Sequence, residues 1–190
     1  MPKPPEPPEP IPTRLPDGTP AVVRPITPDD AALLVAGFEH LSDESRHRRF
    51  LEAIKHLTPQ QVHYLTHADG YRHIAWGVTV ESPETGEPIG VAVARCVRDP
   101  NAPETAEFAI AVADEWQHKG IGSMLARVVA ERALRAGIRR FSGYMWADNR
   151  GAIALMDRLG ELEERHYEAP GVLEATWRLR PGPEPAHRGG

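Results

Sequence analysis

The chain has 190 residues, with a formal net charge of −5 at pH 7 and a hydrophobic content of 41%. These values are ordinary for a globular protein with one buried core, so a single folded domain is expected. The acidic balance argues against a dedicated nucleic-acid binder and against a polybasic membrane-binding module. No apolar run approaches the roughly 20 residues that cross a bilayer. The single cysteine, Cys96, cannot form an internal disulfide, which favours a cytoplasmic location and predicts a small core or edge residue rather than a nucleophile.

Proline-rich segments predict the limits of the folded domain. Residues 1–19 contain the sequence PPEPPEP and lack the apolar segment of a signal peptide, so we expect a disordered, extended tail. Residues 181–190 are rich in proline and glycine and are expected to form a second disordered tail. The domain between the two tails covers residues 20–180.

The first half of the domain is expected to be mostly helical. A strand at residues 21–26 is followed by three short helices, each with a typical N-terminal signal. Thr27 and Thr58 are each followed by proline, and Ser42 is followed by acidic residues, which favour the positive end of a helix.

The second half alternates between strands and helices. Apolar residues at a period of two predict strands at 74–80 and 89–97, joined as an antiparallel hairpin. A central strand follows at 105–113, and apolar residues at a helical period predict an amphipathic helix at 119–136. The remaining predicted elements are a strand at 139–146, a helix at 148–160 and a final hairpin formed by 162–168 and 172–179. This order predicts a mixed α/β fold.

The central strand contains one carboxylate, Glu107, among alanine, phenylalanine and isoleucine residues. A carboxylate in apolar surroundings loses hydration, which would raise its pKa toward the range useful for a general base near neutral pH. The alternative is a structural glutamate paired with an arginine such as Arg46 or Arg95.

A glycine-containing turn, QHKGIGS at residues 117–123, connects this strand to the following helix. Glycine lets the backbone approach an anion closely, and the free amides at a helix N-terminus favour phosphate. The turn lacks the third glycine of a dinucleotide-binding motif, because Leu125 is at that position, and it lacks the Gly-Lys-Ser/Thr ending of a P-loop. Alternatively, a Gly-x-Gly pair before a helix forms only a tight turn.

This turn and a later helix together resemble the GNAT superfamily of N-acetyltransferases. The turn is similar to the superfamily signature Q/R-x-x-G-x-G/A, which follows the fourth strand. The helix that starts at Asn149 resembles the second motif, N-x-x-A-x-x-L-x-x-x-x-G, with Ala152, Leu155 and Gly160 at the matching positions. The resemblance extends over residues 21–179. It implies the GNAT fold, a mostly antiparallel central sheet of six to seven strands flanked by helices.

The resemblance also implies acetyl-CoA as the cosubstrate and no metal. The pantetheine arm of the coenzyme would lie along one edge of the central strand, and its pyrophosphate would bind the amides of the glycine-containing turn. Asn149 and Arg158 match positions that contact the coenzyme in relatives. The predicted cofactor-binding residues are Ile110, Ala111, Val112, Gln117, His118, Lys119, Gly120, Ile121, Gly122, Ser123, Asn149 and Arg158.

A narrower resemblance is to the catalytic domain of bacterial Pat-type protein lysine acetyltransferases. In that group the glutamate that matches Glu107 is the general base, so Glu107 is the predicted catalytic residue. The resemblance favours acetylation of lysine side chains of proteins through a ternary complex, by a monomer or homodimer that binds neither nucleic acid nor membrane. It is found in residues 42–50 and 63–65, in Asp69, Tyr71 and His73, and in residues 106–107 and 112–114.

Two other functions remain open, namely acetylation of a small-molecule amine and non-catalytic sensing of acyl-CoA. The second arises because Met156 stands where many superfamily members have a tyrosine general acid. Tyr144 is near in sequence, but a tyrosine at such a position is more typical of packing than of catalysis.

The histidines and arginines of the helical half have simpler interpretations. His63 and His67 lie four residues apart but have no evident third ligand, so a zinc site is not predicted. We expect His47, His63, His67 and His73 to be solvated or to line the substrate site. Arg46, Arg48 and Arg49 are expected on a solvated helix face, with a role toward the substrate left open.

Overall fold

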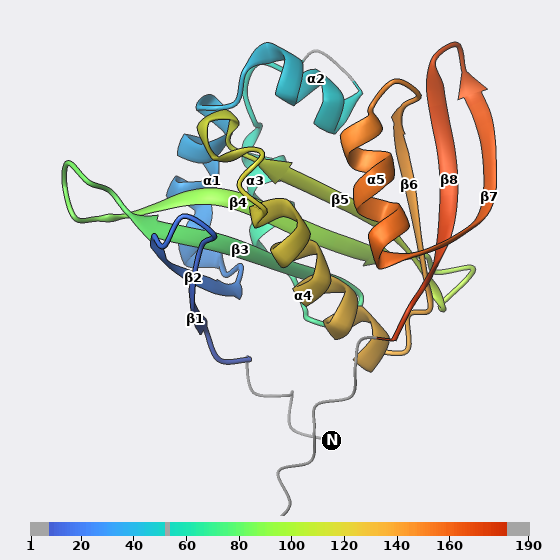
Figure 1. The fold of residues 1–190 in the computed structure, drawn as a ribbon, viewed down its shortest axis with the longest axis horizontal. Coiled ribbons are helices and arrows are strands. Elements are labelled where there is room, and N and C mark those ends of the chain that lie inside the picture. The colour runs from blue at the N-terminus through green and yellow to red at the C-terminus, as the bar shows by residue number, and fades with distance from the viewer. Residues whose placement is uncertain (1–7, 52–53, 182–190) are drawn as a thin grey trace, which may run out of the picture.

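An eight-stranded sheet runs through the molecule in the order β1-β2-β3-β4-β5-β6-β8-β7 (Figure 1). The computed structural model describes residues 8–51 and 54–181. All neighbouring strands pair antiparallel except β5 and β6, which are parallel. The mixed α/β fold with a mostly antiparallel sheet is therefore confirmed. The strands are Ile11–Arg14 (β1), Pro20–Pro25 (β2), His73–Glu81 (β3), Pro88–Arg98 (β4), Thr105–Val112 (β5), Arg140–Trp146 (β6), Gly160–Ala169 (β7) and Val172–Leu179 (β8).

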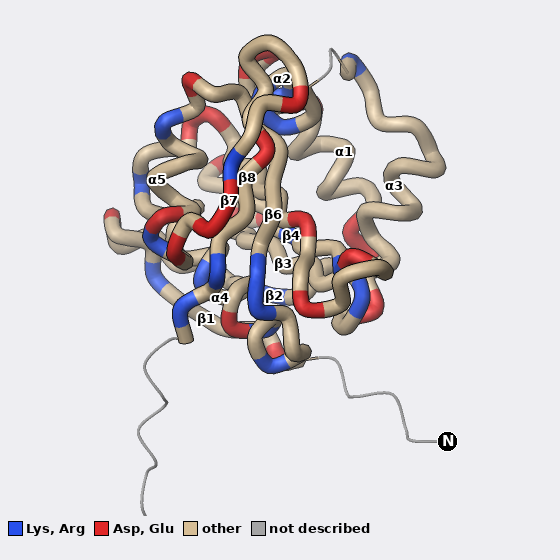
Figure 2. Tube along the Cα trace, turned by 90° about the vertical axis from the view of Figure 1, so that its right-hand side faces the viewer, with Lys and Arg blue, Asp and Glu red and all other residues tan. Residues whose placement is uncertain are grey.

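Helices cover both faces of the sheet. Helices α4 and α5 lie on one face, and α1 and α3 lie on the other (Figure 2). Helix α2 lies at the end of the sheet, in contact with β5 and β6. None of the described helices combines the length and apolar character needed to span a membrane. The helices are Ala31–Glu39 (α1), Asp43–Phe50 (α2), Pro59–Thr66 (α3), Ile121–Arg135 (α4) and Arg150–Leu159 (α5), with 3-10 turns at Pro28–Asp30 (η1) and Asp114–Trp116 (η2).

The expected N-terminal tail is partly wrong, because residues 11–14 form the edge strand β1. Ile11 pairs with Val23 across the β1–β2 hairpin, and Leu15 is only 2% exposed. An edge strand tolerates Pro12, because backbone amides on its outer side donate no hydrogen bond to a neighbouring strand and proline has no amide hydrogen to donate. With this strand the described sheet has eight strands, more than the six to seven strands expected. Residues 1–7, and 182–190 of the expected C-terminal tail, lie outside the described residues.

The predicted helix starts at Ser42 and Thr58 are confirmed by their hydrogen bonds. The Ser42 hydroxyl accepts from the Ser45 amide at 3.2 Å, and Thr58 forms a reciprocal capping box with Gln61. The helix expected to begin at residue 119 begins instead at Ile121, after the turn η2.

Burial explains the single cysteine. Cys96 lies on β4 with no exposed surface, and burial raises the pKa of its thiol to about 12. The thiolate is therefore not populated near neutral pH, and the prediction of a core residue is confirmed. The core around it lies mainly between the sheet and α4; its largest fully buried side chains include Trp76, Trp177, Phe141, Ile74, Ile121 and Leu125.

Gly160 has a packing role at the junction of α5 and β7. Its φ is −158°, which any residue can adopt, so the requirement for glycine does not come from backbone strain. A Cβ at this position would overlap the backbone carbonyl oxygen of Arg178 on β8. The glycine lets α5 pass directly into a paired strand.

We expect Gly160→Ala to lower the free energy of unfolding by about 1–3 kcal/mol, because a backbone carbonyl must shift. Gly151→Ala on the same helix is the control, since a Cβ there would meet only the Asn149 side chain at 3.8 Å. That control should be neutral or slightly stabilising. Thermal unfolding of both variants measures the difference, and equal stabilities would contradict the packing role.

Candidate functional site

The two strands at the centre of the sheet separate soon after they pair. Strands β5 and β6 are in register only at Thr105–Arg140, Ala106–Phe141 and Glu107–Ser142. Strand β4 continues to pair with β5 as far as Val112. The other backbone edge of β5 therefore has no partner among the described strands beyond Glu107, and this edge is open to a ligand. Glu107 is at the point of separation.

A groove of about 580 Å³ lies at this opening, between the start of α4, the start of α5 and α2. Ten of the twelve predicted cofactor-binding residues line it. Lys119 and Ile121 do not: the Lys119 ammonium lies 4.5 Å from the centre of the Trp116 ring, and Ile121 is in the core with 1% exposure. The predicted residues that line the groove are Ile110, Ala111, Val112, Gln117, His118, Gly120, Gly122, Ser123, Asn149 and Arg158.

The turn before α4 has the backbone shape of an anion-binding loop. His118 and Gly120 both have left-handed conformations, with φ values of 59° and 78°. No side chain caps α4 at Gly120, so the amides of its first turn are left for a ligand. Glycine is favoured at position 120 by this positive φ, whereas a Cβ at Gly122 would meet the Val112 and Ile110 side chains at 3.5 and 3.8 Å.

Asp114 attaches α2 to the end of β5. Its carboxylate accepts from the Ser42 amide at 2.7 Å and from the Ser45 hydroxyl at 2.6 Å. Burial acts to raise the pKa of Asp114, but hydrogen bonds from Ser45 and Ser42 outweigh it and lower the pKa. Gln117 extends the network, because its Nε2 donates to the Ser45 hydroxyl and to the Val112 carbonyl, each at 3.2 Å. Residues 42–50 and 112–114, which both belong to the resemblance to Pat-type acetyltransferases, are therefore in direct contact.

The opposite face of α2 contacts the second half of the sheet. Arg48 forms an ion pair with Asp148 at 3.3 Å, and the His47 ring stacks on Trp146 with 5.0 Å between ring centres. Helix α2 therefore bridges the opening between β5 and β6 (Figure 1). Arg48 and Arg49 both line the groove, so the role toward the substrate that the sequence left open for them stays open.

A second cavity, of about 270 Å³, is lined by Glu107, which does not line the groove. We call it the acceptor cavity; it is lined by Arg49, Phe50, Leu57, Gln61, Tyr64, Leu65, Arg95, Val97, Glu107 and Ala109. Glu107 itself is exposed, so the predicted desolvation of its carboxylate is wrong. The reason is the separation of β5 and β6, which leaves the side chain at an open edge.

No ion pair joins Glu107 to Arg46 or Arg95 in the part of the chain that the structure describes. The Arg46 Nε donates to the Leu41 carbonyl at 2.9 Å, and the Arg95 Nη1 donates to the Leu65 carbonyl at 2.9 Å. The alternative of a structural, arginine-paired glutamate therefore has no support from these contacts.

His73 is buried beside Arg95, contrary to the expectation of a solvated histidine. Its Nε2 lies 3.0 Å from the Arg95 Nη1, and its backbone amide donates to Asp69. Burial, together with the positive charge of Arg95, lowers the pKa of His73 to about 4. His73 is thus neutral near pH 7 and accepts the arginine hydrogen bond. His63 and His67 stack on each other, with 3.7 Å between ring centres.

Neither candidate for a general acid is well placed. Met156 is in the core with 3% exposure, which confirms that this position has no proton to offer. A hydrogen bond to Glu174, followed by burial and nearby carboxylates, raises the pKa of Tyr144 to about 12. Tyr144 therefore holds its proton firmly at neutral pH.

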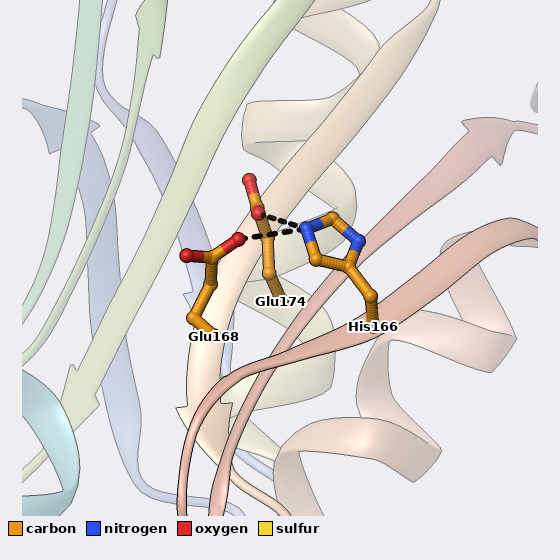
Figure 3. A group of neighbouring side chains, drawn as sticks. All are labelled: His166, Glu168 and Glu174. Atoms are coloured by element: carbon orange, nitrogen blue, oxygen red, sulfur yellow. Dashed lines mark hydrogen bonds and ion pairs between the residues drawn. The ribbon is translucent and has the colours of Figure 1, made fainter.

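One group of potential metal ligands lies on the β7–β8 hairpin, and none of its three residues lines the groove (Figure 3). The Nε2 of His166 lies 2.8 Å from a Glu168 oxygen and 2.7 Å from a Glu174 oxygen. His166 and Glu174 are cross-strand partners, so their contact follows from the strand register. Hydrogen bonding accounts for this cluster, and the absence of a metal stays a prediction.

The fold and the groove define a coenzyme-binding acyltransferase of the GNAT type. The acetyltransferase (GNAT) domain family matches residues 21–161, and the chain belongs to this family. It is 32% identical over 151 residues to acetyltransferase Pat of Mycolicibacterium smegmatis, which matches 80% of this chain and 44% of that protein. The chain therefore spans less than half the length of that relative.

Two further comparisons agree. The crystal structure of the GNAT domain of S. lividans PAT is 31% identical, with a TM-score of 0.78, and the match covers 90% of this chain and 97% of that domain. Acetyltransferase PA5475 of Pseudomonas aeruginosa is 28% identical over 152 residues, 80% of each chain. The predicted family and its acyltransferase activity are confirmed.

From the sequence, Arg49 had only an open role toward the substrate and Arg95 only a possible pairing with Glu107, while Ser45 had no predicted role. Ser45, Arg49 and Arg95 line the groove or the acceptor cavity but are distant from the two motifs in sequence. The available signal was Arg95 in the otherwise apolar strand 89–97, because an arginine is costly to bury without a partner.

The buried His73 predicts a pH dependence of stability. Between pH 6.5 and 4 the unfolded chain binds a proton at His73 that the folded protein does not, because the pKa is lowered from 6.5 to about 4. The free energy of unfolding should therefore fall as the pH drops through this window, by about 1–2 kcal/mol at pH 5.

His73→Gln keeps an oxygen acceptor for Arg95 and removes this titration. Urea unfolding at pH 7.5 and pH 5 should show a smaller pH effect in this variant than in the wild type. His56→Gln, at an exposed position, is the control and should behave as the wild type does. The same pH effect in His73→Gln and the wild type would exclude the buried neutral histidine.

Proposed function

We propose that the protein transfers the acetyl group of acetyl-CoA to a primary amine, with lysine side chains of proteins as the acceptor class. The observation that carries this proposal is the position of Glu107. Among the described residues it is the carboxylate at the separation of β5 and β6. It lines the acceptor cavity, and the groove is lined by Ile110 to Val112 further along the same strand. A donor in the groove and an acceptor in the cavity would meet at this point.

The groove residues support binding of the coenzyme. The pyrophosphate would bind the turn at 117–123, through amides that no side chain caps. The pantetheine arm would bond the open backbone edge from Ile110 to Val112. Arg158, whose Nη1 donates to the Ser123 hydroxyl at 3.2 Å, adds positive charge beside this turn. Asn149 caps α5 through its Oδ1, which leaves its Nδ2 for the coenzyme.

Glu107 would act as the general base. Its exposed carboxylate would remove a proton from the acceptor ammonium, directly or through one water, and the free amine would attack the thioester carbonyl. The oxyanion of the tetrahedral intermediate would accept a hydrogen bond from an amide on the open edge of β5. The intermediate then expels the coenzyme A thiolate, and its nitrogen loses a second proton to solvent to give the neutral amide. The thiolate takes a proton from solvent because neither Met156 nor Tyr144 is suited to donate one.

The exposure of the site supports a protein acceptor. Glu107 and Tyr64 are both exposed at the mouth of the acceptor cavity, so an amine on a long, flexible side chain can reach the carboxylate from outside. A small-molecule amine is the second candidate, because the cavity of about 270 Å³ has enough volume to enclose one.

We expect Glu107→Gln to reduce kcat by about 10²- to 10⁴-fold, with the Kd for acetyl-CoA nearly unchanged, because the amide cannot accept the proton. Steady-state release of coenzyme A measures the first quantity and calorimetry the second. Glu131→Gln, on the exposed face of α4, is the control. A kcat within about tenfold of the wild type would rule out Glu107 as the general base.

We expect Arg158→Gln to weaken acetyl-CoA binding by about 5- to 20-fold while thermal stability stays the same, because one exposed charge beside the pyrophosphate is lost. Arg150→Gln is the matched control: it lies on the same helix, is exposed and does not line the groove. If both variants bind acetyl-CoA as tightly as the wild type, the assignment of Arg158 is wrong.

A further inference from the structure

Two arginines from different elements line the acceptor cavity. Arg49 comes from α2 and Arg95 from β4, and both line this cavity. Arg95 is only 4% exposed, although it is charged. Arg49 also lines the coenzyme groove, whereas Arg95 does not. Both arginines also line an adjoining cavity beside α1, but Glu107 lines the acceptor cavity and not that one.

Neither arginine has a carboxylate partner among residues 8–51 and 54–181. Arg95 is held by two neutral acceptors, the Leu65 carbonyl at 2.9 Å and the His73 Nε2 at 3.0 Å, both through its Nη1. Its Nε and Nη2 make no hydrogen bond to the described residues. The Arg49 guanidinium lies over the Phe50 ring, 4.7 Å from its centre. Buried charges are normally paired, so two neighbouring unpaired guanidinium groups indicate an anionic ligand.

The electrostatics agree with this geometry. Burial, together with the charge of Arg49, lowers the pKa of Arg95 to about 10. Burial also lowers the pKa of Arg49, although the charge of Glu107 opposes this. Both groups remain charged at neutral pH and repel each other. His73 does not add to the charge, because its pKa is about 4.

We propose that Arg49 and Arg95 form a carboxylate-binding subsite of the acceptor cavity. The preferred acceptor would be an amine that also has a carboxylate, either a free amino acid or a lysine beside an acidic residue. This inference rests on the proposed function, since the amine must reach Glu107 while the carboxylate contacts the arginines. Guanidinium groups match the planar, two-oxygen geometry of a carboxylate, and the apolar walls at Phe50, Leu57 and Leu65 exclude competing water.

Equilibrium binding tests the subsite without turnover. The probes are N-acetylglycine, which resembles a product with a carboxylate, and N-acetylglycinamide, its neutral counterpart. Calorimetry on the protein saturated with coenzyme A should give a Kd for the acid about 10- to 100-fold lower than for the amide. Arg95→Met and Arg49→Met should each reduce this ratio to about threefold or less. The matched control is Arg127→Met, on the exposed face of α4, which should keep the ratio.

Folding and the proposed function have separate readouts. Binding of coenzyme A and a single thermal transition show that each variant is folded. If Arg95→Met does not fold, Arg49→Met decides the test, because the Arg49 guanidinium makes no hydrogen bond to the described residues. Equal affinity for acid and amide in the wild type, or a ratio that survives in a folded Arg49→Met, overturns the subsite. Failure of all amines to be acetylated would instead overturn the proposed function.

Turnover assays identify the source of the carboxylate. With acetyl-CoA, kcat/KM is compared for amino acids and their amides, and for lysine peptides with flanking glutamate or glutamine. A kcat/KM at least about tenfold higher for the acceptor with the carboxylate, in either pair, supports the subsite. The pair that shows this difference tells whether the acceptor is a free amino acid or a lysine in a peptide. In a third assay, succinyl-CoA and butyryl-CoA are compared with each other as donors, and the acceptor in both reactions is an amine that lacks a carboxylate. An arginine-dependent preference for succinyl-CoA would place the carboxylate on the donor and overturn the proposal.

Discussion

The structure depends on the short parallel pairing between β5 and β6. Because the two strands are in register for only three residue pairs, the backbone of β5 beyond Glu107 is bonded to β4 on one edge and open on the other. An open edge inside a sheet is unusual, since unpaired backbone groups are costly when they are shielded from water. Here the edge borders a groove, and in the proposed function that groove would determine where the coenzyme meets the acceptor.

Helix α2 stabilises this opening by joining its two sides. Asp114 holds the start of the helix through two serines, and Arg48 ties it to Asp148 at the start of α5. The same helix contributes Arg49 to both the groove and the acceptor cavity. One element therefore fixes the geometry of the opening and supplies charge to the two ligand sites. The loss of its anchors would affect both sites together.

Local sequence patterns predicted most of the fold, and the differences have identifiable causes. Alternating apolar residues predicted the strands correctly because the period of two depends only on which face is buried. The strand β1 was missed because its prolines are typical of an extended tail, whereas an edge strand tolerates them. The environment of Glu107 was predicted wrongly for a similar reason. Its apolar neighbours in sequence are not its neighbours in space, since the strand beside it diverges.

The sequence by itself determined the family, the glycine-containing turn and the order of elements, because these follow from local spacing and from motifs of consecutive residues. It also predicted ten of the residues that line the groove, but not Ser45, Arg48 and Arg49 of α2, which line it as well. Only the tertiary structure decided what lies on the acceptor side. Arg49 and Arg95 line the same cavity although they are 46 positions apart in the sequence. They lie on a helix and a strand, and no local sequence pattern predicts how these two elements are placed relative to each other. Long-range packing brings such charges together, so their chemistry becomes visible only in the folded chain.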